Sequence, residues 1–181
     1  MALQNADELA VVLDRADHLG PVFARHAYGM RAWVDLFSAH VPGLPDPADK
    51  ALLATLVATN ARHMLLFRER AVANGTDPDA YVCPDEGEAI YVRIPELSGA
   101  DELAGYALGS LDHFAELLTV YRGAADRADA EAIDTVRADV DRARDELRER
   151  VGDGADAALA EAHELYRVRE LAEVPLYAHA A

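Results

Sequence analysis

Apolar residues recur every three or four positions through most of the chain, which is the spacing of one face of an α-helix. The first such stripe predicts a single long helix over residues 7–40, kinked where Pro21 removes a backbone donor. A second stripe predicts a helix over residues 47–74, with Asp46 as its N-cap and Gly75 closing its C-terminus.

Two further stripes predict helices over residues 100–122 and 129–151, and a short fifth helix is expected over about 155–173. Residues 75–99 contain several prolines and glycines and lack helical periodicity, so we expect a long connection with one extended stretch at residues 90–94. A connection of about 25 residues can climb the height of a bundle and start the next helix in the same direction. The pattern predicts one all-α domain over residues 1–181, a four-helix bundle over about 7–151 with the fifth helix across an end or side.

The amino-acid composition limits the classes of binding partner and the cellular compartment that we expect. With 51% apolar residues in 181, the chain can build one core, and 33 acidic against 17 basic residues give a net charge of −16. Such a charge repels phosphate backbones and anionic lipid headgroups, which argues against nucleic acid and membrane partners. The single cysteine, the absence of a signal-peptide pattern and the excess of arginine over lysine favour a cytoplasmic protein of a GC-rich bacterium.

Polar residues on the predicted inward faces are the candidates for chemistry. His26 lies within the first stripe but off its centre, Asn60 lies near the centre of the second with His63 one turn further, and Ser110 and His113 lie on the third. A buried polar group without a partner costs about 1–3 kcal/mol, so these residues need hydrogen bonds or a ligand. Two interpretations remain open: a metal or small-molecule site, or a self-satisfied polar cluster with nearby tyrosines that fixes helix register.

The segment NARHMLLFRERAVANGTDP, residues 60–78, resembles helix 2 of the ferritin-like superfamily. In that helix a Glu-x-x-His metal motif precedes an apolar, arginine-rich continuation and a Gly-Asp-Pro turn. The resemblance extends over most of residues 7–151 and implies a ferritin-like bundle with its long crossover between helices 2 and 3. It also implies two irons, held by carboxylates of helices 1 and 3 and by Glu-x-x-His pairs of helices 2 and 4.

The chain departs from that pattern at the metal ligands. Asn60 replaces the glutamate of helix 2, so only His63 carries over, and His26 lies near the position of the helix 1 glutamate. Val140 and Ala143 stand where helix 4 would place its pair. The four main helices present no inward carboxylate, so we expect a degenerate diiron site, with iron storage the least favoured role. The run Glu161-Ala-His163-Glu164 on the fifth helix could supply ligands or form a solvated edge.

Two hypotheses of function follow. The first is an enzyme of altered ferritin-like type, an oxidoreductase among the activities considered, whose former metal cavity binds an organic substrate or one iron, copper or zinc ion. In it His26, His63 and His113 are metal ligands or acid–base groups. The residues expected to bind substrate are Asn60, Trp33, Tyr106, Ser110 and Tyr121. The alternative is a non-catalytic bundle that binds a ligand or serves a structural role after its metal site has decayed.

Self-association is also expected. The resemblance implies pairing through the first two helices, and Tyr28, Leu36, Leu65 and Val72 lie outside the predicted core stripes as candidate contacts. We therefore expect a homodimer that binds a small molecule.

Overall fold

The computed structural model describes residues 6–14, 19–152 and 154–178. Within these residues the chain forms seven α-helices and no strand, so the predicted all-α class is confirmed. The helices are α1 (Ala6–Asp14), α2 (Gly20–Ser38), α3 (Pro47–Ala73), α4 (Asp85–Arg93), α5 (Gly99–Ala124), α6 (Arg127–Arg148) and α7 (Asp156–Ala178). No helix in the described ranges combines the length and the apolar character that a membrane span requires.

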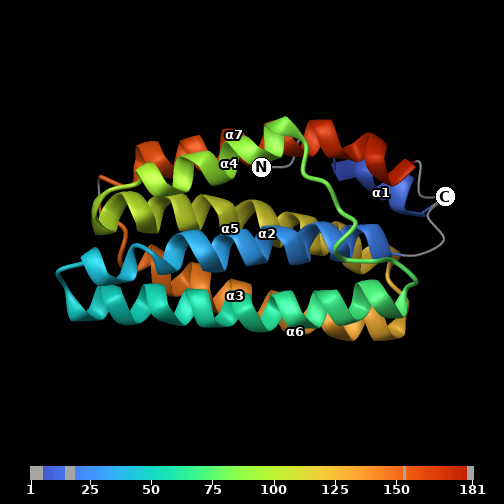
Figure 1. The fold of residues 1–181 in the computed structure, drawn as a ribbon, viewed down its shortest axis with the longest axis horizontal. Helices are drawn as coiled ribbons and strands as arrows, with labels where there is room; N and C mark the ends of the chain where they lie inside the picture. The colour runs from blue at the N-terminus through green and yellow to red at the C-terminus, as the bar shows by residue number, and fades with distance from the viewer. Residues whose placement is uncertain (1–5, 15–18, 153, 179–181) are drawn as a thin grey trace.

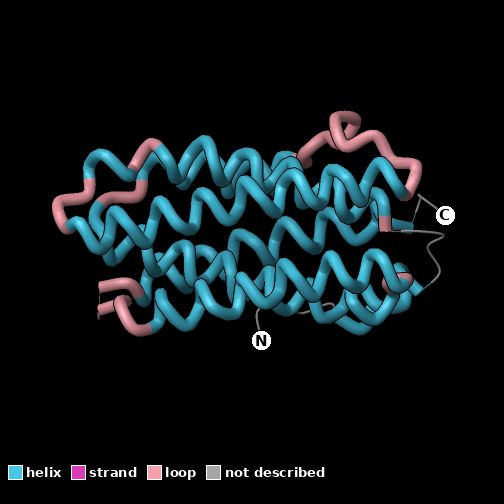
Figure 2. The backbone as a smooth tube through the Cα atoms, turned by 90° about the horizontal axis from the view of Figure 1, so that it is seen from below, coloured by secondary structure: helices cyan, strands magenta, loops and turns pink. Residues whose placement is uncertain are grey.

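The long helices lie side by side with roughly parallel axes, joined at the two ends of the bundle (Figures 1 and 2). In Figure 1, α3 and α5 both begin at the left end, whereas α2 and α6 run the opposite way. Helix α2 packs against α3, α5 packs against both α6 and α7, and α4 lies against α7. The connection between α3 and α5 therefore returns the chain to the end where α3 began, as its length predicts.

The ends of α3 follow the sequence signals. The Asp46 carboxylate accepts a hydrogen bond from the backbone N–H of Ala48 at 2.8 Å, and Pro47 occupies the first turn. Gly75 has a φ of 74°, a left-handed conformation that glycine adopts without steric cost and that ends the helix. Both predicted caps are confirmed.

The predicted single helix over residues 7–40 is wrong, because the chain forms two helices there. Pro21 lies in the first turn of α2, where its missing N–H has no intrahelical partner to lose. The same residue prevents an upstream helix from continuing through it. Helix α1 packs against α5 and α7 instead of extending α2 along α3.

The predicted extended stretch at residues 90–94 is also wrong, because α4 occupies most of it. The buried residues Gly87, Ile90, Tyr91 and Ile94 are spaced three, one and three apart, which is a short helical stripe. Pro84 precedes the helix, and three acidic residues in its first turn favour a helix N-terminus. Because prolines stand on both sides of it, this helix of nine residues was not predicted from the sequence.

The fifth predicted helix is longer than expected. Helix α7 has 23 residues and runs along the side of α5, whereas a short helix was predicted. A Cβ atom on Gly105 would lie 2.4 Å from the Ala155 carbonyl oxygen, and one on Gly109 would lie 2.6 Å from that of Leu159. The two helices therefore touch through their backbones. Asp153, within the predicted break before this helix, lies outside the described residues.

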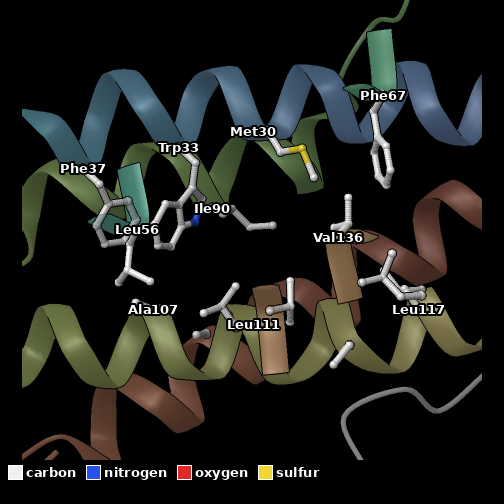
Figure 3. Close-up of a cluster of buried hydrophobic side chains, with 14 of the residues drawn as sticks. Met30, Trp33, Phe37, Leu56, Phe67, Ile90, Ala107, Leu111, Leu117 and Val136 are labelled. Atoms are coloured by element: carbon white, nitrogen blue, oxygen red, sulfur yellow. The ribbon is translucent and has the colours of Figure 1, made fainter. Parts of the chain in front are cut away.

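The apolar core fills the space between the helices (Figure 3). Side chains from α2, α3, α4, α5 and α6 meet there, and Trp33 stacks on Phe37 with ring centroids 3.7 Å apart. The labelled members are Met30, Trp33, Phe37, Leu56, Phe67, Ile90, Ala107, Leu111, Leu117 and Val136. This packing holds the polar side chains described next in a water-poor interior.

Candidate functional site

A partly open cavity of about 60 Å³, called the inner cavity below, lies between α2, α3, α4, α5 and α7. Its polar lining is Arg25, His26, Asn60, Tyr91, Ser110, His113, Tyr166 and Arg169. Its apolar lining includes Met30, Trp33, Leu111, Phe114 and Leu117. A larger cleft of about 370 Å³ at one end of the bundle has leucines, carboxylates and one arginine but no imidazole or phenol. Because polar groups converge in the inner cavity, it is the candidate site.

His113 on α5 is the most unusual residue of the cavity. Its side chain is fully buried, and neither ring nitrogen has a hydrogen-bond partner among the described residues. Burial lowers its pKa to about 3, with Arg25 and Arg169 adding to the effect, so the ring is neutral at physiological pH. A neutral imidazole carries one donor and one acceptor, and both remain unused here.

Glu170 on α7 lies beside His113. Its Oε2 is 3.2 Å from His113 Nε2, yet the two are not aligned for a hydrogen bond, and neither carboxyl oxygen has another partner among the described residues. Its side chain is only 5% exposed. Burial raises the pKa of Glu170 to about 7, against the opposing effect of Arg25. The carboxyl therefore exchanges its proton near neutral pH.

A second carboxylate, Glu173, is held firmly. Arg25 donates from Nε to Glu173 Oε2, Arg169 donates to the same oxygen at 3.1 Å, and the Tyr81 hydroxyl donates to Oε1. Although burial opposes ionisation, the two guanidinium groups keep the pKa of Glu173 below its usual range. Arg169 also donates to the Tyr91 hydroxyl at 2.7 Å. These side chains form one buried cluster, which joins α2, the crossover and α7.

His26 is already satisfied by its neighbours. Its Nε2 lies 2.7 Å from Nη1 of Arg25 and 2.9 Å from the Tyr121 hydroxyl. Because arginine only donates, this nitrogen accepts and the ring proton lies on Nδ1. Burial is the main reason that the pKa of His26 lies well below its usual value, and Arg25 adds to it. His26 therefore fixes Arg25 and Tyr121 in place.

The structure brings most of the predicted site residues together. The cavity is lined by His26, His113, Asn60, Trp33 and Ser110. Tyr121 does not line it, but its hydroxyl lies 2.9 Å from Nε2 of His26.

Two predicted residues lie elsewhere. His63 is buried between α3 and α6, with its Nε2 3.1 Å from Asp139 Oδ2, and it does not line the cavity. Tyr106 is buried too, and its hydroxyl donates to the Ile90 carbonyl at 3.2 Å. The stripe of α3 is wide enough to face two neighbours, so an inward position does not identify which of them a side chain meets.

The residues present do not fit a two-iron centre. In the described part of the chain, no group of three or more His, Cys, Asp and Glu side chains converges as metal ligands, and His26, His63 and His113 do not meet. The buried carboxylate Glu173 is engaged by two guanidinium groups, whose charges repel a metal cation. The Glu161 to Glu164 run does not help, because Glu161 pairs with Arg93 and Glu164 with Arg167.

The sequence pattern missed Arg25, Arg169, Glu170 and Glu173. A signal was present on α7, where Ala155, Ala158 and Ala162 mark a buried stripe that continues through Tyr166 to these charged residues. Charged residues are rarely buried unless they are paired, so their type alone gives no indication of a buried position. Comparison of the chain with known proteins identifies no further site residues, because no known protein family, curated protein or solved structure matches it.

The raised pKa of Glu170 makes stability depend on pH. The folded state holds this proton more tightly than the unfolded state, so stability is lost as the pH rises from about 4.5 to about 7. Glu170→Gln removes that loss, because glutamine does not ionise. The difference in unfolding free energy, variant minus wild type, should therefore be about 1–3 kcal/mol larger at pH 8 than at pH 5. Urea unfolding at both pH values measures it. Glu164→Gln, an exposed change on the same helix, should show no such difference, and an equal effect of Glu170→Gln at both pH values would contradict the assignment.

Proposed function

We propose that this protein is an enzyme of altered ferritin-like type that binds a small organic substrate where its relatives in fold hold metal. The four-helix core would be α2, α3, α5 and α6. The short connections within each pair and the long return between α3 and α5 support this arrangement. The fifth helix, α7, supplies Tyr166 and Arg169 to the cavity wall. Two of its carboxyl groups contact other residues of that wall, Glu170 at His113 and Glu173 at Arg25 and Arg169.

The observation that carries the proposal is His113 in the cavity wall, whose ring nitrogens have no hydrogen-bond partner among the residues that the structure describes. Leaving both nitrogens of a buried imidazole without partners costs about 1–3 kcal/mol per group, which a chain selected for stability alone would avoid. A bound molecule with one donor and one acceptor would satisfy both nitrogens. His113 would then position the substrate through these hydrogen bonds, and Glu170 beside it titrates in the pH range that acid–base catalysis needs.

The cavity sets the size of the group that enters. A cavity of about 60 Å³ holds a few water-sized groups, so it admits a small polar head with a short apolar part. Trp33, the only tryptophan, lines the same cavity and provides an intrinsic probe. Titration with acetate, acetamide and 1-propanol is expected to change Trp33 emission and the ¹⁵N shifts of the His113 ring with at least one of them. The ¹⁵N shifts of His63, outside the cavity, should stay constant, and no response at Trp33 and His113 would favour the structural alternative.

A substitution at His113 separates function from stability. His113→Leu removes a buried polar group that makes no hydrogen bond within the described part of the chain, so the unfolding free energy should rise by about 1 kcal/mol and the melting temperature by about 2–4 °C. The same variant should lose the Trp33 response to the probes. His63→Leu serves as the control, because it breaks the contact with Asp139 and should not gain stability or alter the Trp33 response. A destabilised His113→Leu protein would show that the imidazole is structural.

We also propose that two copies pair through the outer face of α3. Leu65 and Val72, seven residues apart, are each 64% exposed, and Ala51 and Ala58 continue the same line. An antiparallel pair centred between residues 65 and 66 would place Arg62 of one copy opposite Glu69 of the second copy. Two of the predicted contacts fit less well: the Tyr28 hydroxyl donates to Glu88 at 2.7 Å, and Leu36 is half-buried.

Leu65→Glu is expected to convert the dimer to a monomer, because it places two like charges at the centre of the contact. Light scattering at several protein concentrations measures the mass. Val92→Glu, at a residue 67% exposed on α4, is the matched control and should remain a dimer. Exchanging Arg62 and Glu69 together should preserve pairing, whereas either change alone should weaken it. A monomeric wild-type protein at all concentrations would rule out the contact.

A further inference from the structure

We propose that the ligand of the inner cavity is a small organic anion, a monocarboxylate in the simplest case, and that Glu170 takes up a proton when the anion binds. This ligand class rests on the proposed function, because it concerns the same cavity.

The buried charges of the cluster are the first reason. Arg25 and Arg169 both line the cavity, and both donate to Glu173. A carboxylate that enters the cavity would face these two guanidinium groups, which favour a negative charge. Arg25 also favours the ionised form of Glu170. Glu170 and the anion therefore place negative charge in the same region and oppose each other's ionised form.

The two buried carboxyl groups are held to different degrees. Glu173 is fixed by both arginines and by Tyr81, whereas Glu170 has no hydrogen bond to any residue in the described ranges and is not aligned with His113. The His113 ring has an unused N–H to offer an incoming carboxylate. Met30, Trp33 and Phe114 form an apolar wall that suits a short alkyl chain.

Glu170 is the group that changes its proton. The charged and titratable groups that face it are Arg25 on α2, His113 and Glu116 on α5, and Glu173 on its own helix, while Tyr91 of α4 is held by Arg169. Arg25 favours its ionised form, and Glu116 and Glu173 favour the protonated form. His113 stays neutral, because its pKa is about 3. A further negative charge nearby raises the pKa of Glu170 above about 7, so the carboxyl binds a proton as the anion enters.

Isothermal titration calorimetry with sodium acetate tests this linkage. Titrations at pH 7.5 in phosphate and in Tris, at equal ionic strength, give the number of protons bound from the difference in buffer ionisation heat. We expect uptake of about 0.5–1 proton per acetate, and a Kd that rises towards tenfold per pH unit above pH 7. Acetamide, which has the shape of acetate without its charge, should bind at least about tenfold more weakly.

Glu170→Gln and Glu164→Gln form a matched pair on α7. Glutamine cannot ionise, so the Glu170→Gln protein should bind acetate without proton uptake and, at pH 8, about tenfold more tightly than wild type, in which about one tenth of Glu170 is protonated. Glu164→Gln should behave as wild type, because Glu164 is exposed and paired with Arg167. Thermal unfolding of both variants checks that the fold is retained.

The possible results separate the ligand class from the function. Acetate binding without proton uptake, or uptake that persists in Glu170→Gln, overturns the role of Glu170. Equal binding of acetamide and acetate overturns the anion while leaving a small-molecule site in place. Absence of binding by either probe, with Trp33 and His113 signals unchanged, overturns the ligand class and the proposed function together.

Discussion

Replacing both Gly105 and Gly109 with alanine is expected to lower the free energy of unfolding by about 4 kcal/mol or more. Each new methyl group would lie within 2.6 Å of a carbonyl oxygen, that of Ala155 just before α7 or that of Leu159 within it, and a backbone cannot move aside as a side chain can. Overpacking of a core costs about 1–3 kcal/mol per site, and here two sites on adjacent turns push the same pair of helices apart. Urea unfolding followed by circular dichroism measures the loss.

Gly123→Ala in the same helix is the matched control. Nothing lies within 4 Å of a Cβ atom at that position, so the change should be neutral or stabilise by up to about 1 kcal/mol through helix propensity. If the double substitution were as harmless as Gly123→Ala, the close contact between α5 and α7 would be wrong. Helix α7 would then lie farther from the bundle than the structure places it.

Glu173→Ala is expected to destabilise the protein by about 3–5 kcal/mol at pH 7, because it leaves two guanidinium groups without their shared carboxylate in the interior. The pKa of Glu173 is lowered by folding, so its contribution is present above the unfolded-state pKa and is lost as the pH falls through the folded-state value. The difference between wild type and variant should therefore shrink in acid. Chemical unfolding at pH 7 and at pH 3 measures both effects.

The control for Glu173→Ala is Glu164→Ala, which removes an exposed ion pair with Arg167 on the same helix. Exposed pairs contribute about 0–1 kcal/mol, so this change should have little effect. Equal losses from the two substitutions would mean that the arginines find other partners. A loss at Glu173 that did not depend on pH would point to packing instead of charge.

Local signals were sufficient to predict much of the helical framework. The Asp46-Pro47 start and the Gly75 end of α3 could be identified because each depends on a few neighbouring residues. The break before α2 and the length of α7 could not, since they depend on what the segments pack against. In α7 the buried face itself carries Arg169, Glu170 and Glu173, so hydrophobicity alone cannot distinguish that face from a solvent-exposed one.

The candidate site was predictable only in part, for a related reason. The helical stripe placed His26, Asn60 and His113 towards the interior, and all three line the cavity. Their charged partners were not foreseen, because an arginine adjacent to a histidine in sequence gives no indication that it meets a glutamate 148 residues away. Buried ion pairs are decided by tertiary structure, and periodicity describes one helix at a time.

The bond between Arg25 and Glu173 has a consequence for biosynthesis. Arg25 leaves the ribosome early, but its counter-ion is made 148 residues later, and the crossover tyrosines Tyr81 and Tyr91 depend on the same late segment for their partners. A nascent chain cannot complete this buried network until α7 has been synthesised, so formation of the interior waits for a segment that is distant in sequence. A product truncated before Glu173 would lack the carboxylate that Arg25 and Arg169 share, and we expect it to be degraded faster than the full chain.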